Sequence, residues 1–160
     1  MFDQKKTPGT NATQAFDEAR QRRVDIYQAI LALERAAARP AAAREEKWVQ
    51  GVIEALAQLE REIVDHIENT ERPDGLFAEI IDIAPRLSHN VQLLREEHPQ
   101  MLEAASTLKA RLTTEPVGDA RSVEERRDEI QRLLGRLVKH RQHGADLVWE
   151  AYNQDIGGED

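Results

Sequence analysis

The sequence predicts an all-α protein, folded as an up-down-up-down four-helix bundle with a kinked third helix. Apolar residues recur at alternating spacings of three and four along long segments, which is typical of helices that bury one face. No window alternates between apolar and polar residues with period two, and β-branched residues are sparse, so we expect no strands. Turns containing proline and glycine separate four such segments, and short connections favour antiparallel packing of neighbouring helices.

The first two predicted helices lie on either side of Pro40. The first covers residues 12–39 and follows a polar, turn-rich segment, residues 1–11, that we expect to be flexible. The second begins after a run of three alanines and covers about residues 44–70. Pro40 separates them because proline lacks the backbone N–H that a helix interior requires.

The third predicted helix, residues 76–112, follows the turn Arg72-Pro73-Asp74-Gly75. Proline presets φ in such a turn, and glycine accepts a positive φ. Pro85 and Pro99 lie inside this helix, and each removes one N–H and frees the carbonyl four residues back. We therefore expect the third helix to be kinked.

The fourth predicted helix covers residues 122–153 and begins at a Ser-Val-Glu-Glu capping box. The loop before it, residues 113–120, contains one proline and one glycine. Residues 154–160 are expected to form a flexible acidic tail, because two glycines and three acidic residues do not continue a helix. Residues 12–153 are thus predicted to form one bundle.

Charge and composition exclude several classes of function. The chain has 22 Lys and Arg against 30 Asp and Glu, a net charge of -8, so we expect no nucleic-acid partner and no polybasic membrane surface. There is no cysteine, which excludes disulfides, thiolate metal sites and cysteine nucleophiles. The sequence has no long apolar run that would predict a membrane span, and no apolar leader follows its first residues. We therefore expect a cytoplasmic protein.

Three of the five histidines continue the apolar seams of three different predicted helices. His66 follows the seam of the second helix, His98 lies within that of the third, and His140 lies within that of the fourth. We expect these three imidazoles to face the interior. His89 and His143 fall outside the seams and are expected at the surface.

The first predicted helix allows two registers. One register buries Ile26, Ile30 and Leu33, and the other buries Tyr27 and Glu34. The second register would place a carboxylate inside the bundle.

The heights of these side chains along the bundle decide which of them meet. If the chain reverses at residues 73–75, His66 lies about 25 Å from His98 at 1.5 Å per residue. Across the later loop, His140 lies about 7–8 Å from His98 along the bundle axis. In its inward register, Glu34 lies near His98. The predicted cluster is therefore His98, His140 and Glu34, with His66 as a separate candidate.

A histidine in a helical core has two interpretations. It is either a neutral imidazole held by a backbone carbonyl, a hydroxyl or water, or a metal ligand. Imidazole is a common metal ligand, and helical bundles build metal sites from side chains on facing helices. Both interpretations stay open at this point.

Two stretches of sequence resemble the hemerythrin-like HHE cation-binding family. Residues 95–102, R-E-E-H-P-Q-M-L, are followed by L-L-G-R-L-V-K-H ending at His140, and residues 59–71 are similar to the family's second-helix pattern. The resemblance covers about half the chain and implies a four-helix bundle with a non-haem di-iron centre. Such a centre would bind or sense oxygen, or serve in iron or redox handling. The family's carboxylate four residues after a ligand histidine would fall at Thr70 and Gly144.

These observations predict a bundle that binds a metal ion, iron first, or a small ligand in its interior. The candidate metal ligands are His98, His140, Glu34 and His66. The alternative is a metal-free protein-interaction module whose core histidines are structural. The sequence contains no recognised catalytic motif, so no catalytic residue is predicted. The expected partners are the metal ion or small ligand and, through helix faces, a second copy of the chain.

Overall fold

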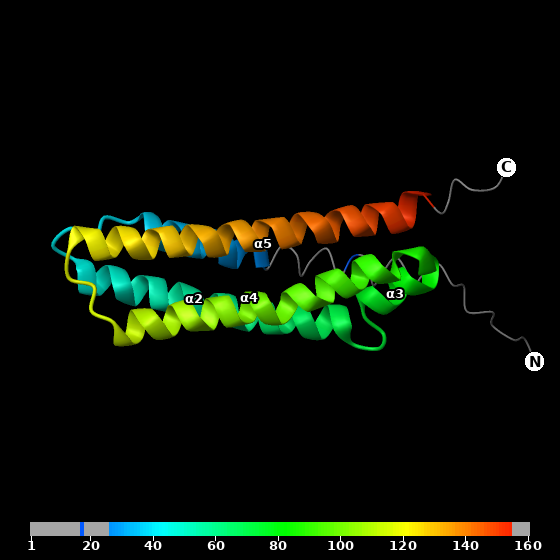
Figure 1. The fold of residues 1–160 in the computed structure, drawn as a ribbon, viewed down its shortest axis with the longest axis horizontal. Coiled ribbons are helices and arrows are strands. Elements are labelled where there is room, and N and C mark those ends of the chain that lie inside the picture. Colours follow the sequence, from blue (N-terminus) through cyan, green and yellow to red (C-terminus); the bar gives the residue numbers. More distant parts are fainter. Residues whose placement is uncertain (1–16, 18–25, 155–160) are drawn as a thin grey trace, which may run out of the picture.

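The protein is helical in all the regular structure that its computed structural model describes, which is residue 17 and residues 26–154 (Figure 1). This confirms the predicted all-α class. After an N-terminal helix over residues 26–38, the elements are α2 (Glu45–Glu71), α3 (Leu76–Ile83), the short 3₁₀ helix η1 (Pro85–Leu87), α4 (Ser88–Thr114) and α5 (Ala120–Gln154). The predicted flexible segment 1–11 and nearly all of the predicted tail lie outside the described residues.

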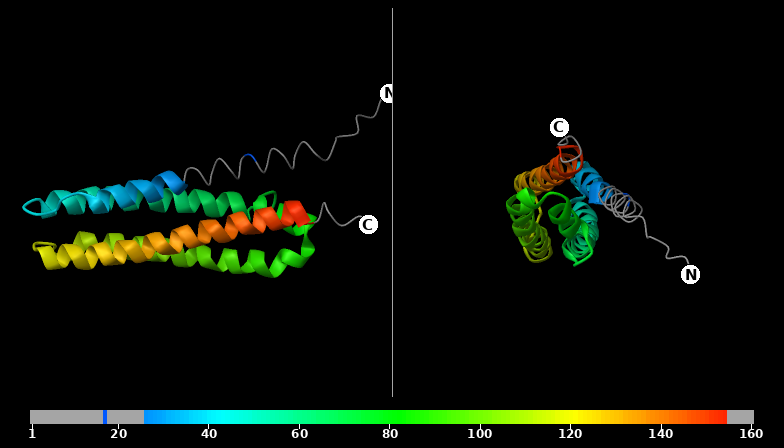
Figure 2. Two further views of the ribbon diagram at one scale, coloured as in Figure 1. Left: turned by 90° about the horizontal axis from the view of Figure 1, so that it is seen from above. Right: turned by 90° about the vertical axis from the view of Figure 1, so that its right-hand side faces the viewer.

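The four long helices pack around a common axis. The end-on view in Figure 2 shows the N-terminal helix, α2, α4 and α5 at the corners of a bundle, and the colours in Figure 1 show that consecutive long helices run in opposite directions. α4 packs against both α2 and α5. Among the described helices, none combines the length and the apolar character that a membrane span requires.

The predicted third helix is divided into α3, η1 and α4. Ala84, between α3 and η1, has φ -135° and ψ 75°, outside the helical region. The residue before a proline is disfavoured in the helical region, so Pro85 ends α3 at this point. Pro99, in contrast, lies inside α4, which continues on both sides of it. The chain therefore reverses direction near Ala84, after α3, and not at the earlier turn (Figure 1).

The turn between α2 and α3 depends on Gly75 for lack of space, not for a positive φ. Gly75 has φ -86°, which corrects the conformation expected from the sequence. A Cβ at this position would lie 2.6 Å from the carbonyl oxygen of Asn69 and 2.9 Å from those of Thr70 and Arg72. The end of α2 therefore folds back tightly over the glycine, and any side chain there would push the turn open.

The N-terminal helix adopts one of its two predicted registers. Ile26, Ile30 and Leu33 are buried, whereas Tyr27 is 41% exposed and Glu34 is exposed. The register that would have placed Glu34 inside is therefore wrong. Apolar residues alone could not decide between the registers, because both offered an apolar stripe.

The apolar core consists of two clusters that share α4 and α5. The first cluster is built from the N-terminal helix, α2, α4 and α5, and on α4 and α5 it ends at Met101 and Leu137. The second is built from α3, η1, α4 and α5, and it begins at Leu94 and Leu147. The residues between these limits include His98 on α4 and His140 on α5. A polar layer thus separates the two parts of the core.

Candidate metal centre

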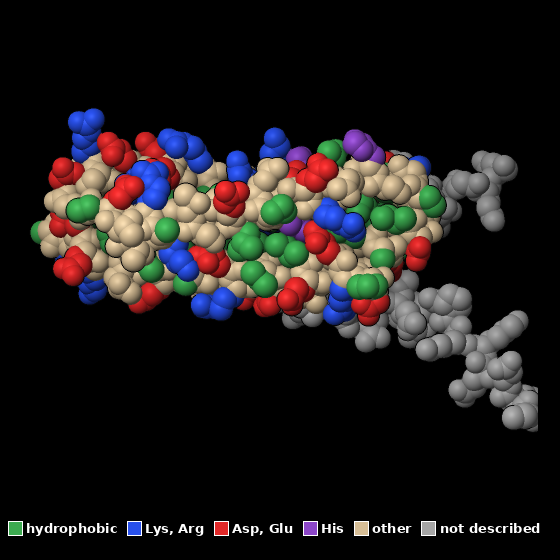
Figure 3. Space-filling model, turned by 60° about the horizontal axis from the view of Figure 1, so that its bottom comes forward, with side chains coloured by type: hydrophobic (Ala, Val, Ile, Leu, Met, Phe, Trp, Pro, Cys, Tyr) green, Lys and Arg blue, Asp and Glu red, His purple; other side chains and the backbone are tan. Residues whose placement is uncertain are grey.

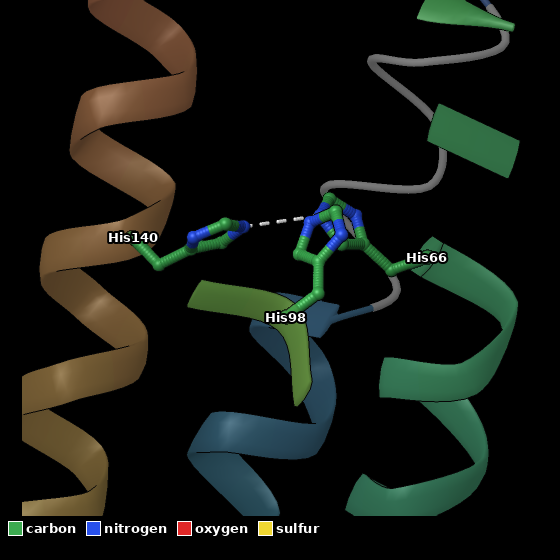
Figure 4. Close-up of side chains that lie close together, drawn as sticks. All are labelled: His66, His98 and His140. Carbon is green, nitrogen blue, oxygen red and sulfur yellow. Dashed lines mark hydrogen bonds between the residues drawn. The ribbon is translucent and has the colours of Figure 1, made fainter. Parts of the chain in front are cut away.

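Three histidines from three helices make up this polar layer. His66 lies near the end of α2, His98 in the first half of α4, and His140 in the second half of α5. Each offers one ring nitrogen, and the three nitrogens lie within 4.8 Å of one another. Figure 4 shows the rings reaching toward one another from their separate helices. We call this set the histidine triad.

One pair of nitrogens in the histidine triad has the spacing of two ligands around one ion. The Nε2 atoms of His66 and His140 are 3.3 Å apart (Figure 4). Ring centroids are 5.0 Å apart for His66 and His98, 5.0 Å for His98 and His140, and 5.4 Å for His66 and His140. Two imidazole nitrogens bound to one tetrahedral ion at about 2.0–2.1 Å lie roughly 3.3–3.4 Å apart. The observed Nε2 separation needs little adjustment to accept an ion.

Two carboxylates orient two of the rings. His98 Nδ1 donates to Oε1 of Glu71 at 2.8 Å, and His140 Nδ1 donates to Oε2 of Glu97 at 2.6 Å. Each bond assigns the ring proton of a neutral imidazole to Nδ1 and leaves a lone pair on Nε2. Metal-ligating histidines usually donate their second ring nitrogen to a carboxylate or carbonyl in this way. Glu71 and Glu97 therefore fix the tautomer of His98 and His140 and leave Nε2 of each ring as an acceptor.

Burial keeps two of these histidines neutral. His98 is fully buried and His140 is 5% exposed. Removal from water lowers the pKa of both rings below the usual value, although the carboxylates of Glu71 and Glu97 act in the opposite direction. A lowered pKa favours the neutral imidazole, which is the form of histidine that binds metal.

The Nε2 atom of His98 has no hydrogen-bond partner in the part of the chain that the structure describes. One face of this ring stacks on Phe77 of α3, with centroids 5.6 Å apart and planes 9° apart. A buried polar atom without a partner is costly, at about 1–3 kcal/mol. A partner for this nitrogen would remove that cost.

The structure brings His66 into the cluster, and the prediction that set it about 25 Å away is wrong. That estimate placed the chain reversal at residues 73–75. The extra length of α3 and η1 moves the reversal toward Ala84, so α4 begins further from α2 along the chain and His98 returns to the height of His66. The estimated height difference between His98 and His140 was closer, because the loop between α4 and α5 is a simple reversal.

Of the other histidines, His89 and His143 are exposed, as predicted. Glu34, the carboxylate predicted in the cluster, is exposed and is not part of it. The carboxylates that do contact the rings, Glu71 and Glu97, were missed. Glu97 lies directly beside His98, a predicted seam position, and that adjacency was the available signal; Glu71 follows Thr70, which only the structure shows to be buried.

No protein family, curated protein or solved structure compared with this chain matches it. The likeness to the hemerythrin-like family accordingly stays a prediction based on the residues quoted above.

Proposed function

We propose that this chain is a metal-binding helical bundle of up-down-up-down topology, in which His66, His98 and His140 hold one divalent transition-metal ion. The observation that carries the proposal is the convergence of three imidazoles from three helices between two apolar clusters. Helical bundles build metal sites in their cores from side chains on facing helices, as these are.

The charges around the histidine triad suit a buried cation. Three neutral imidazoles leave the charge of a divalent ion unchanged, and burying such a charge is costly without compensation. Glu71 and Glu97 lie one ring away and supply two negative charges. Together with a divalent ion they form a group with no net charge, which an interior can hold.

The donor set favours one ion and a transition metal. Imidazole nitrogens suit iron(II), cobalt(II), nickel(II), copper(II) and zinc(II), whereas magnesium and calcium prefer oxygen ligands. Three nitrogens within 4.8 Å of one another suit one ion better than the two irons of a hemerythrin-type centre, which need further histidines and bridging carboxylates. Iron(II), the ion that the resemblance implies, is among the candidates and is the first to be assayed.

A metal-free interaction module is the second candidate function. His66 and His140 satisfy each other in part through the 3.3 Å hydrogen bond without any ion. Trp149 on α5 is 60% exposed and could anchor a protein partner, since aromatic residues are enriched at interface hot spots. The partnerless Nε2 of His98 argues for the first candidate, because the hydrogen bond between the other two rings leaves it unsatisfied.

Metal analysis tests the proposal. The protein is purified without chelator and without nickel affinity resin, and its metal content is measured before and after incubation with iron(II) or zinc(II). We expect one ion per chain in the wild type and a loss of binding in His98→Ala. His89→Ala is the matched control, because His89 is an exposed histidine on the same helix. A wild-type protein that stays metal-free, or a His98→Ala variant that binds as well as the control, would contradict the proposal.

A further inference from the structure

A groove of about 500 Å³ runs along the outside of the bundle between α4 and α5, next to the histidine triad. Its α4 wall includes Glu96 and Glu97, and its α5 wall includes His143, Asp146 and Glu150. Three leucines, Leu93, Leu94 and Leu147, also line it, and among the residues that the structure describes no lysine or arginine does. In Figure 3, histidine side chains (purple) reach the surface of this half of the molecule with acidic side chains (red) beside them.

Glu97 belongs both to this groove and to the buried layer. Its Oε2 atom accepts the 2.6 Å hydrogen bond from Nδ1 of buried His140, and its Oε1 atom lies 3.5 Å from Nδ1 of His143. The His143 side chain is 46% exposed and that of Glu97 is 34% exposed. One carboxylate therefore joins a solvent-accessible histidine to a histidine of the triad, and no other residue separates the two.

The groove keeps a negative charge. Within the described part of the chain, Glu150 is the one carboxylate of the groove that pairs with an arginine or lysine, Arg86, at 2.9 Å. Asp146 accepts a hydrogen bond from Gln142 and Glu96 accepts one from Gln92, and both donors are neutral amides. A cleft lined by one sign of charge raises the local concentration of counter-ions and their rate of arrival.

We propose that this groove is the entry for the metal ion, and that His143 and Glu97 bind the ion in transit to the histidine triad. This inference rests on the proposed function. The hydrated divalent cation is attracted by the acidic side chains of the groove and exchanges part of its water for the imidazole of His143 and the carboxylate of Glu97. Glu97 then turns away from His140, the ion passes to the three Nε2 atoms, and the carboxylate returns to His140 Nδ1. No covalent bond of the protein changes.

The transit ligands are of the type that such a step needs. Two protein donors, one of them an exposed side chain, bind an ion weakly enough to release it to three preorganised nitrogens. The histidine triad offers the ion three nitrogen ligands in place of two donor side chains, and one of the three, Nε2 of His98, has no other partner. Transfer of the ion inward is therefore favourable. His140 and His143 lie three residues apart on α5 and are therefore neighbours along one side of the helix, and Glu97 contacts both.

Rates of metal uptake test the entry. Cobalt(II) is mixed with metal-free protein in a stopped-flow instrument, and its visible absorption is followed for the wild type, His143→Ala and Asp146→Asn. We expect uptake to slow about fivefold or more in His143→Ala and about twofold or more in Asp146→Asn, with the final content still one ion per chain. Added salt should slow the wild type more than Asp146→Asn, because the attraction is screened.

Two matched controls accompany the variants. His89→Ala removes an exposed histidine from α4 outside the groove, and Glu103→Gln removes an exposed carboxylate that lines a different groove. Both should load at the wild-type rate. Loading of His143→Ala and Asp146→Asn at the wild-type rate, or equal slowing of the controls, would overturn the entry and leave the metal site standing. A wild type that takes up no ion would overturn the proposed function and the entry with it.

Discussion

Replacing Glu71 tests whether the carboxylates that accept hydrogen bonds from the histidine triad raise its affinity for a metal ion. Glu71 Oε1 accepts a 2.8 Å hydrogen bond from Nδ1 of His98, and this carboxylate is 27% exposed while the ring is 1% exposed. Glu71→Ala removes the acceptor, the fixed tautomer of His98 and one of the two negative charges that offset the ion. Glu71→Gln keeps an oxygen that can accept the bond but removes the charge.

The expected loss follows from the role of such partners at metal sites. Removing a residue that holds a ligand histidine typically lowers metal affinity by about 10–100-fold, which equals roughly 1.4–2.7 kcal/mol. We expect Glu71→Ala to lie in this range and Glu71→Gln to lie between it and the wild type. In the metal-free protein, Glu71→Ala leaves a buried N–H of His98 without a partner, which should lower the free energy of unfolding by about 1–3 kcal/mol.

Competition with a chromophoric chelator for zinc(II) at pH 7.5 gives the affinities, and urea unfolding of the metal-free proteins gives the stabilities. Glu68→Ala is the control, since Glu68 is an exposed carboxylate one turn earlier on α2. A zinc(II) affinity of Glu71→Ala equal to that of Glu68→Ala would refute the reasoning. A loss of stability without any loss of affinity would assign Glu71 a purely structural role.

The remaining predictions concern pH, the turn and the core. The pKa of both His98 and His140 is lowered in the fold, so as the pH falls the two rings take up protons in the unfolded chain before they do so in the folded one. The free energy of unfolding should therefore fall as the pH is lowered below about 6.5. Urea titrations from pH 7.5 to 5.5 should show a shallower fall for His140→Gln than for the wild type. Gly75→Ala should destabilise the protein by about 1–3 kcal/mol, because its Cβ would lie 2.6 Å from a carbonyl oxygen; a melting temperature equal to that of the wild type would contradict this. Leu137→Ala should cost about 2–5 kcal/mol in urea unfolding, because this side chain is 1% exposed in the first cluster; a cost under about 1 kcal/mol would show a loosely packed core.

The helical fold was predictable because the apolar spacing is regular. The second and fourth predicted helices differ from α2 and α5 by one or two residues at their ends. The third was predicted as one helix with a bend, but Pro85 ends α3 outright. A proline at the start of a new helix and a proline inside a helix have the same sequence signature, and tertiary contacts decide between them. Pro99, inside α4, is the opposite outcome.

The orientation of the histidines was predictable and their heights were less so. A seam position fixes which way a side chain points, and that placed His98 and His140 in the interior correctly. The height of His66 depended on the length of the connection from α2 to α4, which contains α3 and could not be inferred from a turn motif. Glu71 and Glu97 were missed because helical periodicity says nothing about how far a flanking carboxylate reaches across to a neighbouring helix.

The X-ray absorption spectrum of the metal-loaded protein tests the central claim most directly. The fine structure at the metal edge counts the nitrogens around the ion and recognises imidazole by its outer-ring scattering. We predict three imidazole ligands in the wild type, supplied by His66, His98 and His140, and no such shell in a variant that lacks them. A bound ion surrounded only by oxygen would contradict the assignment of these three side chains as its ligands.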